Sequence, residues 1–81
     1  MRIDYTPKAL DGISVLPIPV KKAFYKQVGF LETNLRHPSL RAKKYEGLAD
    51  VWQARVNDDW RFYFLITSDA YLILEVIPHP K

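Results

Sequence analysis

The chain has 81 residues, a net charge of +3 and no cysteine. A chain of this size buries one modest core, and a hydrophobic share of 48% excludes an intrinsically disordered protein. Without cysteine there is neither a disulfide framework nor thiol chemistry, which fits a reducing cytoplasm. The longest apolar run, Phe62–Ile66, is far shorter than the roughly 20 residues of a membrane helix. We therefore expect one cytoplasmic domain over residues 1–81, with no membrane partner.

Positive charge is concentrated in the middle of the chain. Residues 20–48 contain seven basic and two acidic side chains, whereas residues 49–81 contain three and five. A basic block of this kind indicates a surface that meets polyphosphate or an acidic partner. The ordinary alternative, a solvated helix face, stays open for Lys21, Lys22 and Lys26.

The N-terminal segment predicts a short strand and then a short helix. Residues 2–6 favour a strand and are stopped by Pro7. Thr6 and Pro7 suit the N-cap and the first position of a helix over residues 8–16. The expected apolar side of that helix contains Leu10, Ile13 and Leu16.

A longer amphipathic helix is predicted from Pro19 to Arg36. Its apolar positions recur at helical spacing, and they are Val20, Ala23, Phe24, Val28, Leu31 and Leu35. His37 and Pro38 end the helix, because a residue before proline disfavours the α conformation. His37 is expected to interact with the terminal carbonyls. Residues 39–50 are interpreted as a basic connection with a turn near its glycine.

Three strands are predicted over residues 51–57, 60–67 and 70–77, joined by short polar connections. Strands joined in this way form an antiparallel meander. The long amphipathic helix needs an apolar surface, and the meander needs a cover. An N-terminal strand, a helical hairpin and a three-stranded meander therefore predict an α+β fold, a two-layer sandwich.

Arg55 and Arg61 lie on the first two strands of this meander. A two-residue connection between the strands would mix polar and apolar side chains on both faces, so burial of the apolar set requires an odd connection or a bulge. Arg55 then faces either Arg61 or Tyr63. The face under the helix is expected to contain Trp52, Ala54, Val56, Trp60, Phe62, Phe64 and Ile66.

The third strand is expected to add Leu72, Leu74 and Val76 to the core, with Tyr71, Ile73, Glu75 and His79 on the other face. Two adjacent arginines on that face repel each other unless an anion lies with them. Glu75 is one candidate, which would make the cluster an ordinary ion-pair network. A ligand is the other, since guanidinium groups suit phosphate and Tyr63 offers a stacking surface for a base.

Three segments resemble one known family when they are taken in order. They are a helix that leads into "HPSLRAKKYEGLAD", the strand pair "VWQARVNDDWRFYFLI" and the terminal "LEVIPHPK". Over nearly the whole chain this arrangement is similar to the RelE/ParE superfamily of toxins from type II toxin-antitoxin modules. The resemblance implies the same α+β fold. In the RelE branch, the toxin cuts mRNA inside the ribosome without a metal, whereas ParE relatives act on DNA gyrase.

The resemblance also implies roles for individual residues, and it implies no cofactor and no metal. The residues in catalytic positions are Arg55, Arg61, His79 and Lys81. The residues expected to contact RNA or the ribosome are Gln53, which stands where RelE has a lysine, Tyr63 by its place beside the arginines, and Arg41, Lys43 and Lys44 by their charge. The alternative that the lysines only keep the connection solvated stays open. The implied partners are a cognate antitoxin, mRNA on the ribosome and ribosomal RNA, with DNA gyrase as the alternative target.

Three hypotheses about function stay open at this point. The first is a toxin that acts as a ribosome-dependent mRNA endonuclease, an mRNA interferase, and inhibits translation. The second is a non-catalytic binder of the same fold, either a gyrase inhibitor or an antitoxin-binding protein, whose effect would depend on helix residues such as Lys22 and Lys26. The third is a plain RNA-binding module, whose RNA affinity would depend strongly on salt.

Overall fold

The computed structural model describes residues 1–45, 47 and 50–79. These residues form two α-helices and a five-stranded mixed sheet with the order β1-β5-β4-β3-β2. The elements are β1 (Arg2–Tyr5), α1 (Pro7–Ser14), α2 (Ile18–Thr33), η1 (Pro38–Leu40), β2 (Lys43–Lys44), β3 (Val51–Arg55), β4 (Trp60–Ile66) and β5 (Ala70–Pro78). The structure confirms the α+β class that the sequence predicts.

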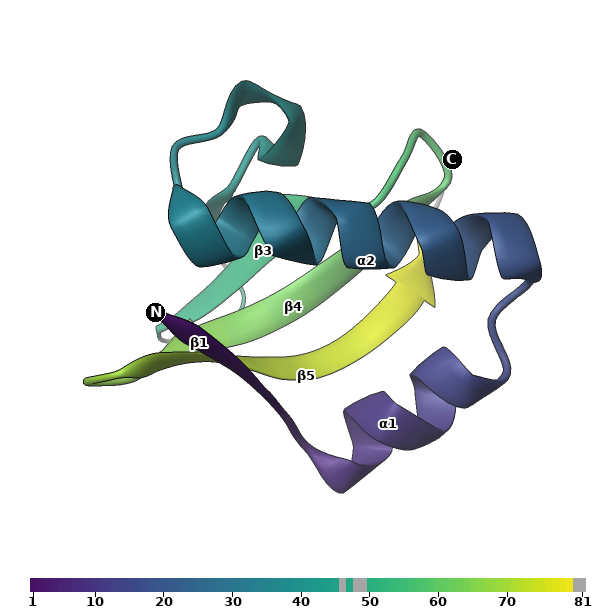
Figure 1. Ribbon diagram of the computed structural model, residues 1–81, viewed down its shortest axis with the longest axis horizontal. Helices are drawn as coiled ribbons and strands as arrows, with labels where there is room; N and C mark the ends of the chain where they lie inside the picture. The colour runs from purple at the N-terminus through teal and green to yellow at the C-terminus, as the bar shows by residue number, and fades with distance from the viewer. Residues whose placement is uncertain (46, 48–49, 80–81) are drawn as a thin grey trace.

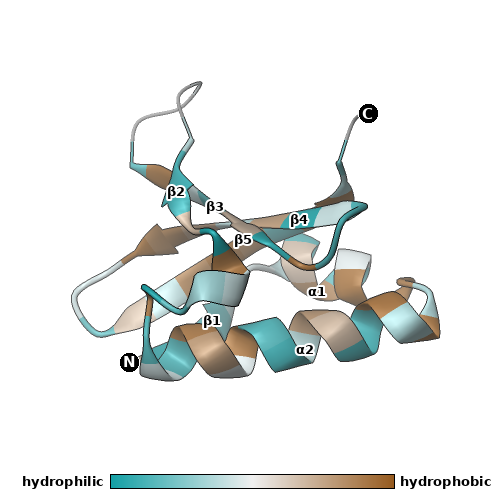
Figure 2. Cartoon of the chain, turned by 90° about the horizontal axis from the view of Figure 1, so that it is seen from above, coloured by the Kyte–Doolittle hydropathy of each residue, from teal (hydrophilic) through white to brown (hydrophobic). Residues whose placement is uncertain are grey.

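The two layers are arranged so that one side of the sheet stays open. Figure 1 shows α2 lying across the sheet, with α1 beside β5. Both helices lie on the same side of the sheet (Figure 2). In the described part of the chain, no helix is long and apolar enough to cross a membrane. Because both helices cover the same side of the sheet, polar side chains on the uncovered side are placed to meet a partner or solvent.

Thr6 joins the first strand to the first helix. β1 pairs in parallel with the first half of β5. The Thr6 hydroxyl accepts a hydrogen bond from the Ala9 N–H at 3.0 Å and donates one to the Leu74 carbonyl at 3.1 Å. This confirms the predicted N-cap, since a threonine oxygen here satisfies a free N–H of the first turn. The same hydroxyl also fixes α1 against β5.

The buried side of α1 differs from the prediction in one residue. Ile13 and Leu16 are buried as expected, but Leu10 is 52% exposed. Ala9 takes the inward position, because it lies four residues before Ile13 and seven before Leu16. The prediction that Leu10 shares this side is therefore wrong.

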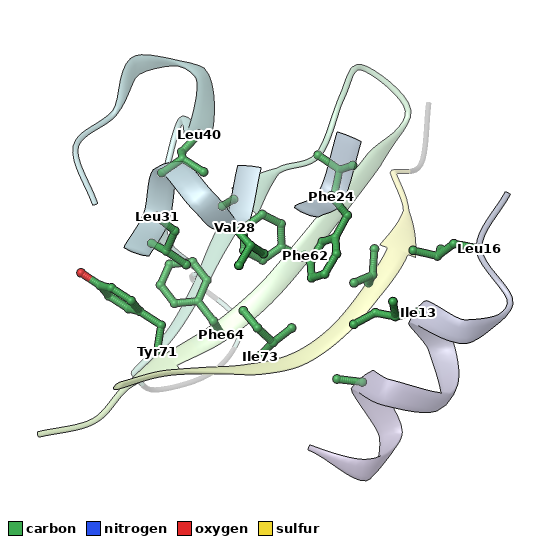
Figure 3. Close-up of a cluster of buried hydrophobic side chains, with 14 of the residues drawn as sticks. Ile13, Leu16, Phe24, Val28, Leu31, Leu40, Phe62, Phe64, Tyr71 and Ile73 are labelled. Atoms are coloured by element: carbon green, nitrogen blue, oxygen red, sulfur yellow. The ribbon is translucent and has the colours of Figure 1, made fainter. Parts of the chain in front are cut away.

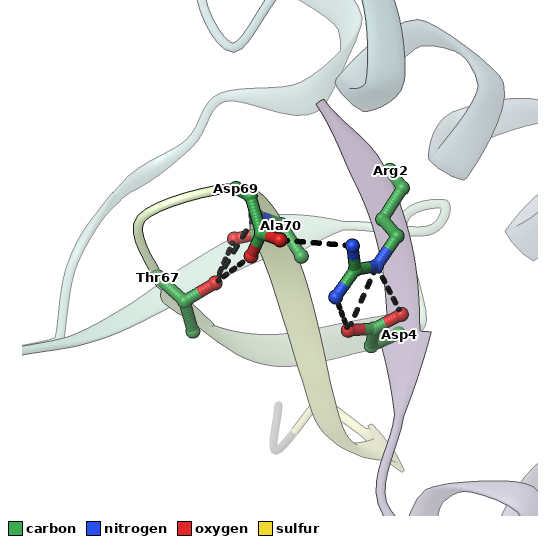
Figure 4. Close-up of polar contacts among 5 residues, drawn as sticks. All are labelled: Arg2, Asp4, Thr67, Asp69 and Ala70. Carbon is green, nitrogen blue, oxygen red and sulfur yellow. Dashed lines mark hydrogen bonds and ion pairs between the residues drawn. The ribbon is translucent and has the colours of Figure 1, made fainter.

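Arg2 links β1 to the turn between β4 and β5 (Figure 4). Its guanidinium forms ion pairs with Asp4 at 3.0 Å and Asp69 at 2.8 Å. Thr67 closes the turn, because its hydroxyl accepts a hydrogen bond from the Ala70 N–H at 3.1 Å and donates one to the Ala70 carbonyl at 3.0 Å. These groups are exposed, so solvent screens the pairs and they serve alignment more than stability.

The long helix α2 ends at Thr33 rather than at Arg36. Asn34 already has an extended backbone, with φ −161° and ψ 103°. Its side-chain oxygen accepts a hydrogen bond from the Arg36 N–H at 3.0 Å. A local bond of this kind competes with helical bonding. The predicted helix is confirmed, and its last three residues are wrong because the pattern carries no signal for this turn.

The segment after α2 contains more structure than the predicted connection. His37 does not serve the carbonyls of α2 with its side chain. Its ring stacks on Phe30 with centroids 3.9 Å apart, and its Nδ1 accepts a hydrogen bond from the Ser39 N–H at 3.2 Å, at the start of η1. η1 then places Leu40 in the core. β2, which the sequence analysis missed, pairs antiparallel with β3.

The register of β3 and β4 places Arg55 opposite Arg61. It is one of the two registers that the sequence allows. Trp52 and Trp60 pack partly buried against the core. Figure 3 shows buried side chains of that core, among them Phe24, Phe62 and Ile73. The buried core cluster consists of Ala9, Ile13, Leu16, Val20, Phe24, Val28, Leu31, Leu40, Ala54, Val56, Phe62, Phe64, Tyr71, Ile73 and Val76.

A β-bulge in β5 overturns part of the predicted alternation. The pairing with β4 skips one residue of β5, Leu74. An extra residue of this kind reverses the faces on one side of it. Tyr71 and Ile73 are therefore buried before the bulge and Val76 after it, while Leu72 and Leu74 are only partly buried. The predicted side of the sheet is therefore right for Val76 and wrong for Tyr71, Leu72, Ile73 and Leu74.

Ile66 is more exposed, and Val51 more buried, than the alternation along their strands suggests. Ile66 is 41% exposed, because it lies at the end of β4 beside the turn to β5. Its assignment to the core is wrong. Val51 is 8% exposed, although it shares the face of Gln53 and Arg55. The uncovered side of the sheet thus contains a local apolar area.

Two leucines on helices test the observed core. Leu31→Ala in α2 is expected to lower the free energy of unfolding by about 2–5 kcal/mol, because Leu31 is fully buried. Leu10→Ala in α1 is the matched control and is expected to change it by less than about 0.5 kcal/mol. Urea denaturation measures both. Equal losses would contradict the observed placement of α1.

Candidate functional site

The uncovered side of the sheet arranges its polar side chains in cross-strand rows. One row contains Arg55 and Arg61, which are direct partners. The next row is formed by partners on four strands, namely Lys43, Gln53, Tyr63 and Glu75. Alternate residues of a strand point to the same side and lie about 6.6 Å apart. The two rows are therefore neighbours on one surface.

A hollow of about 270 Å³ lies over the first row, and we call it the arginine hollow. Its lining residues are Arg41, Lys43, Gln53, Ala54, Arg55, Arg61 and His79. All but Ala54 are residues that the sequence analysis nominates for catalysis or RNA contact. Segments far apart in the chain thus bring their basic groups to one place.

The other nominated residues lie elsewhere. Tyr63 lines a neighbouring hollow on the same side of the sheet. Lys44 is the partner of Trp52 and follows the alternation to the other side. Lys81 lies outside the described residues. The arginine hollow therefore contains three of the four predicted catalytic residues.

Glu75 does not neutralise the two arginines. Its carboxylate forms an ion pair with Lys8 of α1 at 2.9 Å. The predicted alternative, a network of Arg55, Arg61 and Glu75, is therefore wrong. Arg55 pairs instead with Asp58, whose side chain is 87% exposed. An ion pair this exposed is weak, so Arg55 can exchange Asp58 for a stronger anion.

Arg61 is held by the backbone. Its Nη1 donates hydrogen bonds to the Asn57 carbonyl at 2.5 Å and the Trp60 carbonyl at 2.9 Å. Among the described residues, Arg61 forms no ion pair with a carboxylate. These bonds orient the guanidinium without cancelling its charge. The fork of a guanidinium fits two oxygens of a phosphate, so the remaining donors of Arg61 favour an anion in the hollow.

His79 reaches the arginine hollow because the end of β5 is tied to the β3–β4 connection. The His79 N–H donates a hydrogen bond to the Asp59 carbonyl at 2.7 Å. An imidazole has one nitrogen that can donate a proton and one that can accept it, so it suits proton transfer. No group of three or more metal-ligating side chains occurs within residues 1–45, 47 and 50–79.

Charged groups of both rows, Glu75 and Arg61, act on the Tyr63 hydroxyl. Partial burial raises the pKa of the Tyr63 hydroxyl above its usual value, Tyr45 and Glu75 raise this pKa further, and Arg61 lowers it. Tyr63 therefore stays protonated and neutral at physiological pH. A neutral ring at this place adds a polar group beside the arginine hollow without adding charge to it.

Gln27 is a positioning residue that the sequence analysis missed. Its side chain is buried, and its Nε2 donates hydrogen bonds to the Arg55 carbonyl at 2.8 Å and the Ser39 carbonyl at 3.0 Å. The Ser39 hydroxyl donates to the Gln27 Oε1 at 3.1 Å. Gln27 thus joins α2 to η1 and to the end of β3 that bears Arg55. Its place among the apolar positions of α2 was the available signal.

The fold is similar to that of several solved toxin structures. A chain of the archaeal RelE-RelB complex from Pyrococcus horikoshii OT3 matches with a TM-score of 0.77 and 21% identity, over 95% of this chain and 92% of that one. The YoeB/ParE toxin from Agrobacterium tumefaciens matches with a TM-score of 0.82 and 10% identity, over 99% of this chain and 100% of that one. A chain of the RelB-RelE antitoxin-toxin complex from Methanococcus jannaschii matches with a TM-score of 0.76 and 13% identity, over 93% of this chain and 88% of that one.

No family model and no curated protein sequence matches the chain. The likeness is therefore one of fold, at identities too low to align individual functional residues. It nevertheless covers nearly the whole chain and places it among folds of the RelE/ParE type. What the arginine hollow can bind therefore depends on its own geometry and charge.

Two glutamines test the role of Gln27 in holding β3. Gln27→Leu is expected to lower the free energy of unfolding by about 1–3 kcal/mol, because the partly buried carbonyls of Arg55 and Ser39 lose their donor. Gln53→Leu, on the uncovered side of the sheet, is the matched control and is expected to stay within about 0.5 kcal/mol. Urea denaturation measures both variants. An unchanged stability of Gln27→Leu would contradict the role of Gln27 as a link between α2 and Arg55.

Proposed function

We propose that this chain, which has the fold of RelE- and YoeB-type toxins, is the toxin of a type II toxin-antitoxin module and cuts mRNA on the ribosome. The observation that carries the proposal is the pairing of Arg55 with Arg61 across β3 and β4. Within the described residues, Arg61 meets no carboxylate. Two arginines kept together in this way are stabilised by a phosphate between them.

The proposed reaction needs no metal. The 2′-oxygen of one nucleotide attacks the adjacent phosphorus and loses its proton, while the bond from phosphorus to the 5′-oxygen breaks and that oxygen gains a proton. Negative charge grows on the phosphate oxygens during the attack. Arg55 and Arg61 are placed to stabilise that charge. His79, at the edge of the same hollow, is assigned the proton transfer.

The remaining basic residues are assigned to binding. Arg41 and Lys43 line the arginine hollow and extend its positive charge across β2. They are assigned to the backbone of mRNA or ribosomal RNA, together with Lys44. Lys81 is assigned a supporting charge. A cognate antitoxin is the expected protein partner, because the matched structure from Methanococcus jannaschii is an antitoxin-toxin complex.

Arg61→Ala tests the proposal. In a reconstituted translation reaction, primer extension on an mRNA is expected to show cuts with the wild-type protein that require ribosomes. Arg61→Ala is expected to lower the cleavage rate by about 10²- to 10³-fold, as the loss of one donor to a developing oxyanion does. Arg61→Lys retains the charge but not the fork, and is expected to restore only part of the rate.

The control is Arg36→Ala, since Arg36 is exposed and lies outside the arginine hollow. It is expected to cleave like the wild type. Growth arrest that survives Arg61→Ala but disappears with Lys22→Ala and Lys26→Ala on α2 would contradict a nuclease. That outcome would favour a non-catalytic binder, with DNA gyrase as the target to assay next.

A further inference from the structure

A second hollow lies on the uncovered side of the sheet, beside the arginine hollow. Its lining residues are Tyr45, Val51, Tyr63, Leu74, Glu75 and Ile77, and its volume is about 170 Å³. We call it the tyrosine hollow. It is smaller than the roughly 300 to 1,000 Å³ of a pocket for a drug-sized ligand. Its size therefore suits one ring rather than a whole cofactor.

Two tyrosines form the aromatic part of this hollow. The rings of Tyr45 and Tyr63 meet edge to face, with centroids 5.3 Å apart and planes at 80°. The Tyr45 N–H donates a hydrogen bond to the Val51 carbonyl at 2.7 Å, which extends the β2–β3 pairing by one residue. Tyr45 is 40% exposed. Tyr63 is therefore held within the sheet, on β4, while the ring of Tyr45 offers accessible surface.

Gly47 leaves room for the ring of Tyr45. A Cβ at position 47 would lie 2.8 Å from Tyr45 Cε2, closer than carbon atoms approach. The ring is the far end of a flexible side chain, so it can move aside without unfolding the protein. Gly47→Ala is therefore expected to displace the Tyr45 ring and keep its chemistry unchanged.

The ordinary interpretation is an aromatic pair that only covers the sheet, as cross-strand pairs do. Two features favour a ligand. The space beside the rings has an aliphatic floor, which includes Val51 and Ile77. A carboxylate, Glu75, borders it, and a cover for apolar surface needs no such group. Stacking surface with one polar acceptor at its edge is the arrangement that reads a single base.

Glu75 limits which base fits. Its carboxylate forms one ion pair, with Lys8. A carboxylate accepts about four hydrogen bonds, so it has capacity left for a donor in the hollow. Cytosine, adenine and guanine carry an amino group that donates to such an oxygen. Uracil has one donor on its pairing edge, the ring N3–H, and the carbonyl oxygens on both sides of that donor repel a carboxylate.

We propose that the tyrosine hollow binds one unpaired RNA base that carries an amino group, while the adjoining phosphate lies at Arg55 and Arg61. This inference rests on the proposed function and adds a base preference to it. Tyr63 lies two residues along β4 from Arg61, on the same side of the sheet, a step of about 6.6 Å. One nucleotide spans that step from its phosphate to its base.

Two matched RNA probes test the inference on the protein alone. They are a uridine hexanucleotide and the same oligonucleotide with one internal cytidine, which differ at one pyrimidine position and carry equal phosphate charge. At fixed salt, the wild type is expected to bind the cytidine probe about 10-fold more tightly, as one hydrogen bond to a charged group gives. Equal binding of the two probes would overturn the base preference.

Matched variants separate the two hollows. Tyr45→Ala and Gly47→Ala are expected to weaken binding of the cytidine probe by about 5- to 100-fold without changing the salt dependence, since they remove stacking and not charge. Glu75→Ala is expected to abolish the cytidine preference. Lys8→Ala breaks the same ion pair and is expected to retain the preference. Arg61→Ala is expected to weaken both probes alike.

The cleavage assay keeps the two proposals distinguishable. Ribosome-dependent cleavage whose rate and cut positions are unchanged in Tyr45→Ala and Glu75→Ala would overturn this inference and leave the proposed function intact. Absence of cleavage by the wild type would remove the proposed function, whatever the probes do. Lost affinity for the antitoxin with unchanged RNA binding in Tyr45→Ala would make the hollow a protein-docking surface and also overturn the inference.

Discussion

The register between β3 and β4 is the constraint on which the site depends. It places Arg55 opposite Arg61 and at the same time turns Ala54 and Phe62 toward α2. A shift of one residue would turn one of the two strands over, so that polar and apolar side chains would be mixed on both faces and one of the two guanidinium groups would be buried. The hydrophobic effect therefore enforces an arrangement of like charges that electrostatics alone would oppose. Folding free energy holds the arginines together before any ligand arrives.

The positive charges of Arg55 and Arg61 are only partly compensated by neighbouring groups. Asp58 is the partner of Arg55 but lies in solvent, and Arg61 is oriented by backbone carbonyls. Glu75, which is a neighbour on the same side of the sheet, is engaged by Lys8. The result is an oriented positive site that is preformed for an anion. Preorganised donors of this kind need no rearrangement as charge develops on a phosphate.

Much of this arrangement can be predicted from local patterns. Periodicity finds the helix that bears Phe24 and Leu31, and alternation limits Arg55 to two possible partners. The bulge at Leu74 cannot be predicted in this way, because one inserted residue in β5 leaves composition and hydrophobicity unchanged. The link from Gln27 to Arg55 joins residues 28 positions apart and depends on tertiary packing. The partner of Glu75 depends likewise on where α1 packs.

The central claim is that Arg55 and Arg61 act on one phosphate, and a double-mutant cycle on ribosome-dependent mRNA cleavage tests it most directly. The cleavage rates of Arg55→Ala, Arg61→Ala and the double variant are compared with that of the wild type, at equal concentrations of protein freed of antitoxin. The account predicts that the double variant loses much less than the product of the two single losses, because residues that serve one group are not additive. Strictly multiplicative losses, or no loss in either single variant, would contradict it.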